Sequence, residues 1–505
     1  MNSDYSKYVS LMRKIADVNN SIGVLSWDQE VYMPEKGAEA RAQQVSTLSG
    51  ISHELFTSDE LGNVLELLKN DTSLSSIEKK NIEETLRDYL RNKKYSTAFV
   101  KELSETVSQS FQAWRKAKDS DDFEIFAPLL KKVVALKRKE CEIIGYEGHP
   151  YNALLDLYER GATVEGLDII FDEVKKQLIP FVKKIAELPQ VPSSFLFKHY
   201  DKNEQWNFGI EMLTQMNYDF DAGRQDISSH PFTISFASKD VRVTTRVNEN
   251  DFREMLWSCI HEGGHALYEQ GLKPDNYGLP TGEAISLGIH ESQSRLWENN
   301  VGRSLIYWKC NYPRLQQVFP DNLSNVSLEE FYKAINVVEP SFIRTSADEL
   351  TYHFHVIIRY EIEKALIEGT IEVDDLPHIW NEKYKQYLGI DVPSNKNGVL
   401  QDIHWSHGSF GYFPTYSLGS FYASQFFSKA KESIPGLEDL IEQGNLKPLL
   451  DWLRENIHQY GKQYTAEELC IKVTGEKLNF KHFMDYAWNK FSFIYDIKRE
   501  TTTVS

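Results

Sequence analysis

Two histidines flank a glutamate in the short motif His261-Glu262-Gly263-Gly264-His265. Histidines four residues apart lie on the same face of an α-helix, so both imidazoles can bind one metal ion. The glutamate beside them can take a proton from a water molecule that the metal activates. The spacing therefore predicts a zinc-type hydrolytic site, with His261 and His265 as metal ligands and Glu262 as the catalytic base.

A third ligand is expected downstream of His265, because a catalytic zinc usually has three protein ligands and one open position. Two glutamates are candidates. Glu283 lies in the sequence Thr-Gly-Glu-Ala, and Glu291 lies in Gly-Ile-His-Glu-Ser-Gln at the start of a predicted helix. We favour Glu291, because Gly288 permits a close helix approach and Arg295, one turn further on, can hold the carboxylate.

Two related classes of metallopeptidase do not fit the residues around the motif. The metzincin pattern needs a glycine and a third histidine where this chain has Tyr268 and Gly271. The Gly-Ala-Met-Glu-Asn type of motif, which anchors a substrate amine in many zinc aminopeptidases, is absent upstream of His261. Neither a metzincin nor an aminopeptidase is therefore expected.

The metal motif needs a helix to hold it, and residues 250–271 have the signals of one. Asp251 and Glu254 resemble a capping box at its start, and Gly271 can end it in the left-handed conformation. The two glycines of the motif each cost roughly 1 kcal/mol of helix stability relative to alanine. We expect either room for substrate or a closely packed neighbour to compensate for that cost.

The rest of the chain is mainly helical in its apolar periodicity, from residue 1 to about 190 and again from Asp251 onward. Residues 230–247 are the exception, because apolar and polar residues alternate on both sides of a possible turn at Ser238 and Lys239. This segment predicts a β-hairpin. Its strand at residues 240–247 could pair with an extended peptide by β-addition, or it could equally be one strand of an ordinary hairpin. A single large, mainly α domain is the simplest arrangement.

The 505 residues carry a formal net charge of −18, which argues against nucleic acid as a partner, because phosphate binding needs a basic patch. A run of about 18 apolar residues is absent, as is a secretory signal at the N-terminus, so we expect a cytoplasmic protein without a membrane partner. The cysteines are scattered without a CxxC pair and are predicted to be reduced thiols. They are Cys141, Cys259, Cys310 and Cys470.

Six motifs between residues 230 and 405 occur in the order typical of one known family. They are His230-Pro231-Phe232, Asp240-Val241-Arg242-Val243-Thr244, His261-Glu262-Gly263-Gly264-His265, His290-Glu291-Ser292-Gln293, Ile343-Arg344-Thr345-Ser346-Ala347-Asp348 and Gly398-Val399-Leu400-Gln401-Asp402-Ile403-His404-Trp405. The chain resembles the metallocarboxypeptidases of the carboxypeptidase Taq type, peptidase family M32. Residues 26–34 also look like this family, so the resemblance extends over the whole chain.

The resemblance implies a mainly α, two-lobed zincin-type peptidase fold with a deep active-site groove, similar to neurolysin and angiotensin-converting enzyme. Residues 1–505 would form a single M32-type catalytic domain, with a mainly helical scaffold lobe at residues 1–200 and the metal-site lobe at residues 201–505. The resemblance also implies a homodimer and one divalent metal ion per chain. Zinc is the first expectation, with cobalt and manganese as alternatives.

The implied activity is hydrolysis of the C-terminal peptide bond of peptides that have a free C-terminus, releasing single amino acids with broad specificity. Glu291 would be the third metal ligand. Arg344 would bind the terminal carboxylate, through two parallel hydrogen bonds of its guanidinium, unless it forms a helix-surface pair with Asp348. Further residues near the matched motifs could bind substrate or an oxyanion, although a buried structural role is an equal alternative for each. They are His230, His404, His407, Tyr412 and Tyr416.

Two other functions remain open. An oligopeptidase on the same fold would cut internal peptide bonds and would need no free C-terminus. A non-catalytic helical scaffold could also use the same ligands for a structural metal. His353 and His355 are two residues apart on a predicted helix, point to different sides and are expected to have structural roles.

Overall fold

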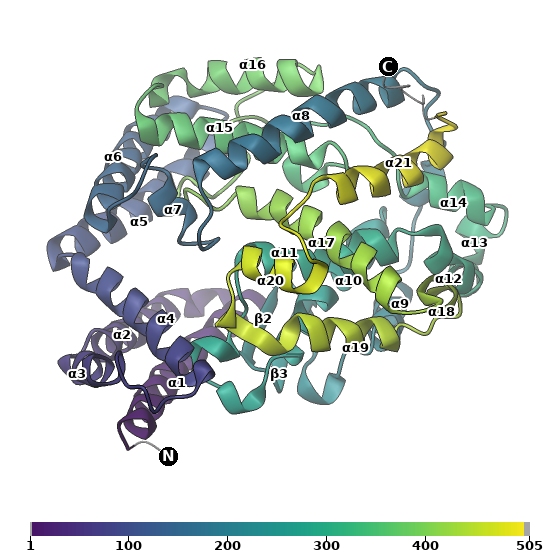
Figure 1. The fold of residues 1–505 in the computed structure, drawn as a ribbon. Coiled ribbons are helices and arrows are strands. Elements are labelled where there is room, and N and C mark those ends of the chain that lie inside the picture. Colours follow the sequence, from purple (N-terminus) through teal and green to yellow (C-terminus); the bar gives the residue numbers. More distant parts are fainter. Residues whose placement is uncertain (1–2, 499–505) are drawn as a thin grey trace, which may run out of the picture. The chain divides into compact units, whose positions relative to one another are not determined.

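The structure is a computed structural model that describes residues 3–498, and almost all of its regular structure is helical (Figure 1). Helix accounts for 69% and strand for 3%, which confirms the mainly α class. The helices before the sheet are α1 (Ser3–Val31), α2 (Ala38–Phe56), α3 (Asp59–Leu68), α4 (Ser76–Lys94), α5 (Thr97–Ser120), α6 (Ala127–Ile144), α7 (Asn152–Leu155), α8 (Val164–Ala186) and α9 (Lys202–Gln215).

Helices resume directly after the sheet and continue towards the C-terminus. They are α10 (Arg253–Gln270), α11 (Leu287–Arg295), α12 (Leu305–Val318), α13 (Pro320–Leu323), α14 (Leu328–Ala334), α15 (Tyr352–Glu368), α16 (Leu376–Leu388), α17 (Pro414–Ser433), α18 (Leu437–Glu442), α19 (Lys447–Asn456), α20 (Ala466–Thr474) and α21 (Lys481–Tyr495). A search of residues 3–498 found that none of these helices is long and apolar enough to cross a membrane.

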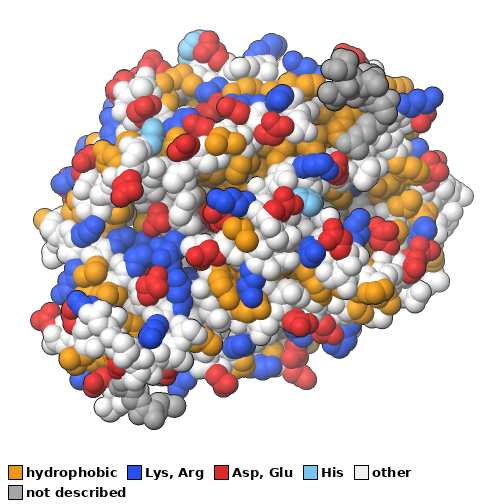
Figure 2. All heavy atoms as spheres, viewed as in Figure 1, with side chains coloured by type: hydrophobic (Ala, Val, Ile, Leu, Met, Phe, Trp, Pro, Cys, Tyr) orange, Lys and Arg blue, Asp and Glu red, His pale blue; other side chains and the backbone are white. Residues whose placement is uncertain are grey.

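The chain forms two compact units, and each unit is built from three separate segments. Unit 1 comprises Met1–Lys93, Pro192–Ile335 and Tyr422–Leu478, and unit 2 comprises Lys94–Val191, Asn336–Phe421 and Asn479–Ser505. The metal motif lies in unit 1, and Arg344 lies in unit 2. Acidic side chains are spread over the face drawn in Figure 2, in keeping with the net charge of −18.

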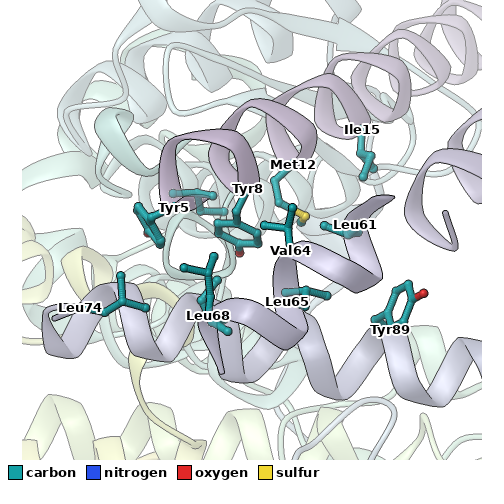
Figure 3. Packing of buried hydrophobic residues seen from close by; sticks show 12 residues of the cluster. Tyr5, Tyr8, Met12, Ile15, Leu61, Val64, Leu65, Leu68, Leu74 and Tyr89 are labelled. Carbon is teal, nitrogen blue, oxygen red and sulfur yellow. The ribbon is translucent and has the colours of Figure 1, made fainter. Parts of the chain in front are cut away.

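The N-terminal helices of unit 1 share an apolar core that also includes the loop between the two helices of the metal site. Apolar side chains of α1, α3 and α4 face one another in this core (Figure 3). Leu279, from the loop between α10 and α11, belongs to the same cluster. In addition, the amide of Thr281 donates to Oδ1 of Asn81 on α4 at 3.0 Å. The N-terminal helices thus help to hold the loop that joins α10 to α11.

The three strands form one small sheet in unit 1, in the order β1-β3-β2. Strand β2 (Thr233–Ala237) is antiparallel to β3 (Asp240–Thr245), so the predicted hairpin is confirmed. Strand β1 (Gln225–Ile227) is parallel to β3 and was not predicted, because three residues are too few to show an alternating pattern. Since β3 lies between two strands, the expectation that residues 240–247 pair with a peptide is wrong.

Helix α10 is present as predicted, but neither of its ends forms in the predicted way. The carboxylate of Glu254 binds Arg246, with Oε2 and Nη2 2.7 Å apart, and does not close a capping box. Gly271 has φ −89° and ψ −8°, which is right-handed. His458 packs so closely against this position that only glycine fits, because a Cβ on residue 271 would lie 2.6 Å from Nδ1 of His458.

Candidate metal centre

Helices α10 and α11 bring the three predicted metal ligands together. One ligand atom from each of His261, His265 and Glu291 lies within 4.8 Å of the other two. Oε2 of Glu291 is 3.6 Å from Nε2 of His261 and 3.4 Å from Nε2 of His265. Two imidazole nitrogens and one carboxylate oxygen are a donor set that suits a catalytic zinc with an open position. The alternative ligand Glu283 forms an ion pair with Lys462 instead.

The two glycines of the motif allow α10 to approach its neighbours closely. A Cβ on Gly263 would lie 2.7 Å from Cδ2 of Leu213 on α9. A Cβ on Gly264 would lie 2.7 Å from Cα of Ser294 and 2.8 Å from the carbonyl oxygen of Gln293, both on α11. Of the two explanations considered for these glycines, the packed neighbour is confirmed, and at Gly264 the neighbour is the backbone of the helix that carries Glu291.

The substitution Gly264→Ala is expected to destabilise the fold and to weaken metal binding, because backbone atoms of α11 cannot move aside as a side chain could. Overpacking of this kind costs about 1–3 kcal/mol. Urea unfolding and zinc titration of the apo-protein would measure both effects. Gly50→Ala is the matched control, because in residues 3–498 a Cβ there would meet nothing within 4 Å beyond the adjacent backbone of its own helix. Equal stability of the two variants would contradict the close packing of α10 on α11.

Glu262 is held in place by the β-hairpin. The residue is 8% exposed, and its Oε2 accepts a hydrogen bond from Oγ1 of Thr233 on β2 at 2.7 Å. Burial raises the pKa of Glu262, while the charge of His261 and the hydrogen bond from Thr233 act in the opposite direction. A glutamate beside the metal site is a residue type that can serve as both general base and general acid. Thr233 was not identified from the sequence, because its contact depends on how the hairpin packs on α10.

Charged residues at the end of α11 and directly after it contact the proposed ligands. Arg295 donates from Nε to Oε1 of Glu291 at 2.7 Å, as predicted. Glu298 lies in a π-helix at residues 296–302, and its Oε2 is 2.8 Å from Nδ1 of His261. Arg303 contacts the other oxygen of Glu298, with Nη2 and Oε1 2.9 Å apart. Glu298 was missed in the sequence, because the π-helix changes the spacing of side chains after Arg295.

The ionisation of two of the proposed ligands, Glu291 and His265, suits metal binding. Burial alone would raise the pKa of Glu291, but the positive charges of Arg295 and His261 hold it well below the ordinary value. Burial, aided by the charge of His290, lowers the pKa of His265 to about 3. The carboxylate is therefore ionised and His265 is neutral at pH 7, as ligands of a metal must be.

Arg344 lies buried in unit 2, in contact with a carboxylate. Its side chain is 8% exposed, and Nε and Nη2 lie 3.0 and 2.9 Å from Oδ1 of Asp402. Arg359, which is fully buried, donates from Nε to the other oxygen of Asp402 at 2.6 Å. Within residues 3–498, Asp402 is the one carboxylate paired with these two guanidinium groups. The alternative partner Asp348 instead accepts hydrogen bonds from backbone amides.

Three other predicted binding residues form a cluster, and one of them, Tyr416, lies against Arg344. The guanidinium carbon of Arg344 lies 4.8 Å from the ring centre of Tyr416. Nε2 of His404 is 3.2 Å from the hydroxyl of Tyr416, and the rings of Tyr412 and Tyr416 are 5.2 Å apart. His407 is exposed, and its ring lies 5.3 Å from that of Phe111.

The remaining histidines of interest have other surroundings. His230 is exposed in unit 1, and its carbonyl oxygen accepts a hydrogen bond from Ser228. His353 and His355 are buried and contact different partners, since Nδ1 of the first lies 3.0 Å from Oγ of Ser417 and Nδ1 of the second lies 2.9 Å from the hydroxyl of Tyr384. This agrees with the structural roles predicted for them.

A buried carboxylate anchors the loop between His404 and Tyr412. Glu363 on α15 accepts hydrogen bonds from Nε1 of Trp405 and from the amide of Gly411, both at 2.8 Å. Burial, as the largest cause, raises the pKa of Glu363 to about 7. The folded protein therefore binds a proton at this side chain more tightly than the unfolded chain does.

We expect this carboxyl to make stability depend on pH. Because the pKa of Glu363 is raised on folding, its contribution is fully present below about pH 4.5 and is lost as the pH rises through about 7. The difference in free energy of unfolding between wild type and Glu363→Gln should change by roughly 3 kcal/mol over that range. Urea unfolding of both proteins from pH 4.5 to 8 measures it, and a constant difference would contradict the raised pKa.

The helices, the ligand cluster and the buried glutamate beside it define the class of protein as a metallopeptidase. The family model described as carboxypeptidase Taq (M32) metallopeptidase matches residues 7–491. Carboxypeptidase 1 of Bacillus subtilis is 40% identical over 491 residues, 97% of this chain and 98% of that protein. Thermostable carboxypeptidase 1 of Thermus thermophilus is 39% identical over 97% of this chain and 99% of that protein.

A solved structure agrees with these relatives. The crystal structure of the M32 carboxypeptidase from Deinococcus radiodurans R1 is similar, with a TM-score of 0.96, 35% identity and coverage of 98% of this chain and 100% of that chain. The chain belongs to the carboxypeptidase Taq (M32) family, and it is a metal-dependent carboxypeptidase.

Proposed function

We propose that the enzyme removes single amino acids of broad specificity from the free C-terminus of peptides, with Glu262 as the catalytic base. One divalent metal ion would be held by His261, His265 and Glu291. Zinc suits two imidazoles and a carboxylate best, and cobalt or manganese would accept the same donors. The observation that carries the proposal is the approach of the three ligand atoms to within 4.8 Å of one another.

When bound, the metal would polarise the peptide carbonyl and lower the pKa of a water molecule. Glu262 would take the proton from that water and pass it to the departing amino group. Thr233 fixes the carboxylate by its 2.7 Å hydrogen bond, so the base keeps one orientation through both transfers. Glu298 and Arg295 would hold His261 and Glu291 as ligands.

The direction of cleavage is attributed to Arg344. It and Arg359 share the single carboxylate of Asp402, which leaves one positive charge without a matching negative charge in this buried group. A buried charge of this kind favours an anionic ligand, and the terminal carboxylate of a peptide would supply it. His404, Tyr412 and Tyr416 are proposed to line the same substrate-binding region, because Tyr416 lies against Arg344 and the other two contact Tyr416.

Three further parts of the proposal rest on other observations. His230 is proposed to contact substrate because it is exposed beside the strand that holds Glu262. We propose a cytoplasmic enzyme, since its four cysteines are free thiols in the described chain, as expected in a reducing compartment. A homodimer is proposed from the family resemblance.

A pair of peptides that differ only in a free or amidated C-terminus tests the direction of cleavage. The free peptide should be shortened by one residue at a time, and the amidated peptide should be cut at least tenfold more slowly, because a neutral amide cannot form the charge-assisted pair with Arg344. Rates are followed by chromatography of the released amino acids. Equal cleavage of both peptides, at internal bonds, would favour the oligopeptidase alternative instead.

A further inference from the structure

The outer nitrogens of the two histidine ligands have different partners. Nδ1 of His261 lies 2.8 Å from a carboxylate oxygen of Glu298. Nδ1 of His265 lies 2.5 Å from Nδ1 of His290, and the two rings are 4.4 Å apart at 28° to each other. Nε2 of His290 is in turn 2.9 Å from Oε1 of Glu269. Nδ1 of His261 thus contacts a carboxylate directly, whereas Nδ1 of His265 is linked to a carboxylate through the imidazole of His290.

Hydrogen positions in this chain of contacts follow from the need for a metal ligand. Nε2 of His265 faces Glu291 at 3.4 Å and must be unprotonated to bind a metal, so its proton is on Nδ1. That Nδ1–H can donate only if Nδ1 of His290 accepts. The proton of His290 is then on Nε2, where the carboxylate of Glu269 accepts it. One arrangement of protons satisfies every contact.

Both helices of the metal site contribute to this chain of contacts. Glu269 follows His265 by one turn on α10, and His290 directly precedes Glu291 on α11. The side chains of His290 and Glu269 are 21% and 15% exposed, so their contact is largely shielded from solvent. The ring of Tyr268 lies 5.5 Å from that of His290 and limits its movement.

We infer that His290 and Glu269 are positioning residues that fix the orientation and the tautomer of His265 for metal binding. This inference rests on the proposed ligand set. Histidine ligands in general gain basicity when the outer N–H meets a carboxylate, and loss of such a partner weakens metal binding about 10–100-fold. Glu269 acts on the metal only through His290, and it lies outside the motifs matched in the sequence.

The test measures the dissociation constant of zinc for the chelator-stripped protein, by competition with a chromophoric chelator. His290→Phe keeps a ring beside His265 and removes the acceptor, and it should weaken zinc binding 10–100-fold. Glu269→Gln keeps an oxygen acceptor and removes the charge, so its effect should be smaller, about threefold to tenfold. Glu283→Gln is the matched control, since this carboxylate pairs with Lys462, and it should bind zinc as the wild type does.

A variant with both substitutions shows whether Glu269 acts through His290 or independently of it. If Glu269 acts through His290, adding Glu269→Gln to His290→Phe should weaken zinc binding no further. Effects that multiply, or a His290→Phe variant that binds zinc like the control, would overturn the inference. Circular dichroism of each apo-protein checks folding. If His290→Phe does not fold, Glu269→Gln decides alone, and wild-type affinity in that variant would also overturn the inference.

A different measurement tests whether the proposed ligand set is itself correct. His265→Ala should bind zinc far more weakly than any of these variants, because it loses a ligand and not a partner of a ligand. If His265→Ala retained wild-type affinity, the proposed ligands would be wrong. The cobalt-substituted protein provides a second readout, since the visible spectrum of cobalt depends on its ligands. It should change strongly in His265→Ala and slightly in His290→Phe.

Discussion

The variant Glu262→Gln is expected to lose catalysis and to keep its metal. Glutamine has the shape of glutamate but cannot take a proton, so kcat should fall by about 10²–10⁴-fold, the usual contribution of a general base. Metal content should stay near that of the wild type, because the proposed ligands are His261, His265 and Glu291. Elemental analysis and the release of amino acids from a peptide measure the two properties.

A substitution at Thr233, whose hydroxyl donates to Glu262, serves as the control for this variant. Thr233→Val removes the hydroxyl that donates to Glu262 but leaves the carboxylate, so kcat should fall much less than in Glu262→Gln. Retained activity in Glu262→Gln would remove this glutamate from the proposed role. Loss of the metal together with activity would assign it to the metal site instead.

The second large effect is expected at Arg344. Arg344→Ala should lower kcat/KM for peptides with a free C-terminus by about 10²–10³-fold, mainly through KM, because truncating one partner of a buried charge pair costs 2–5 kcal/mol. The already slow cleavage of amidated peptides should hardly change. Steady-state kinetics on the two kinds of peptide measure the difference.

The surroundings of Arg344 make the variant suitable for this test. Asp402 keeps its contact with Arg359 when Arg344 is replaced, so its charge stays paired and the protein should fold. Arg344→Lys keeps the charge but not the planar fork of donors, and it should give an intermediate kcat/KM. An equal loss on free and amidated peptides would show that Arg344 does not bind the terminal carboxylate.

Local features of the chain could be predicted because they depend on neighbours in the sequence. The positions of His261 and His265 on one helix face follow from the helical repeat, and the hairpin follows from alternating residues on either side of a turn. The predicted caps at the two ends of α10 were wrong, because tertiary contacts decide the structure there. Glu254 pairs with Arg246, and His458 packs against Gly271, and neither contact is visible in the local sequence.

The surroundings of the metal site could be predicted only in part. Arg295 was found because it lies one turn after Glu291. Thr233 was missed because it reaches the site from β2, and Glu298 because it lies in a π-helix, which changes the spacing of side chains. Glu269 was missed because its contact is with His290 of the other helix. Likewise, the sequence shows no linker between the two compact units, since each of them is assembled from three separate segments.

Mass spectrometry of a mixed pool of peptides tests the central claim most directly. The pool is incubated with the enzyme alone, with a chelator, and with a chelator followed by excess zinc. We expect each peptide to shorten one residue at a time from its C-terminus, the chelator to stop the reaction, and zinc to restore it. Internal fragments, shortening from the N-terminus, or full activity in the presence of the chelator would contradict a metal-dependent carboxypeptidase.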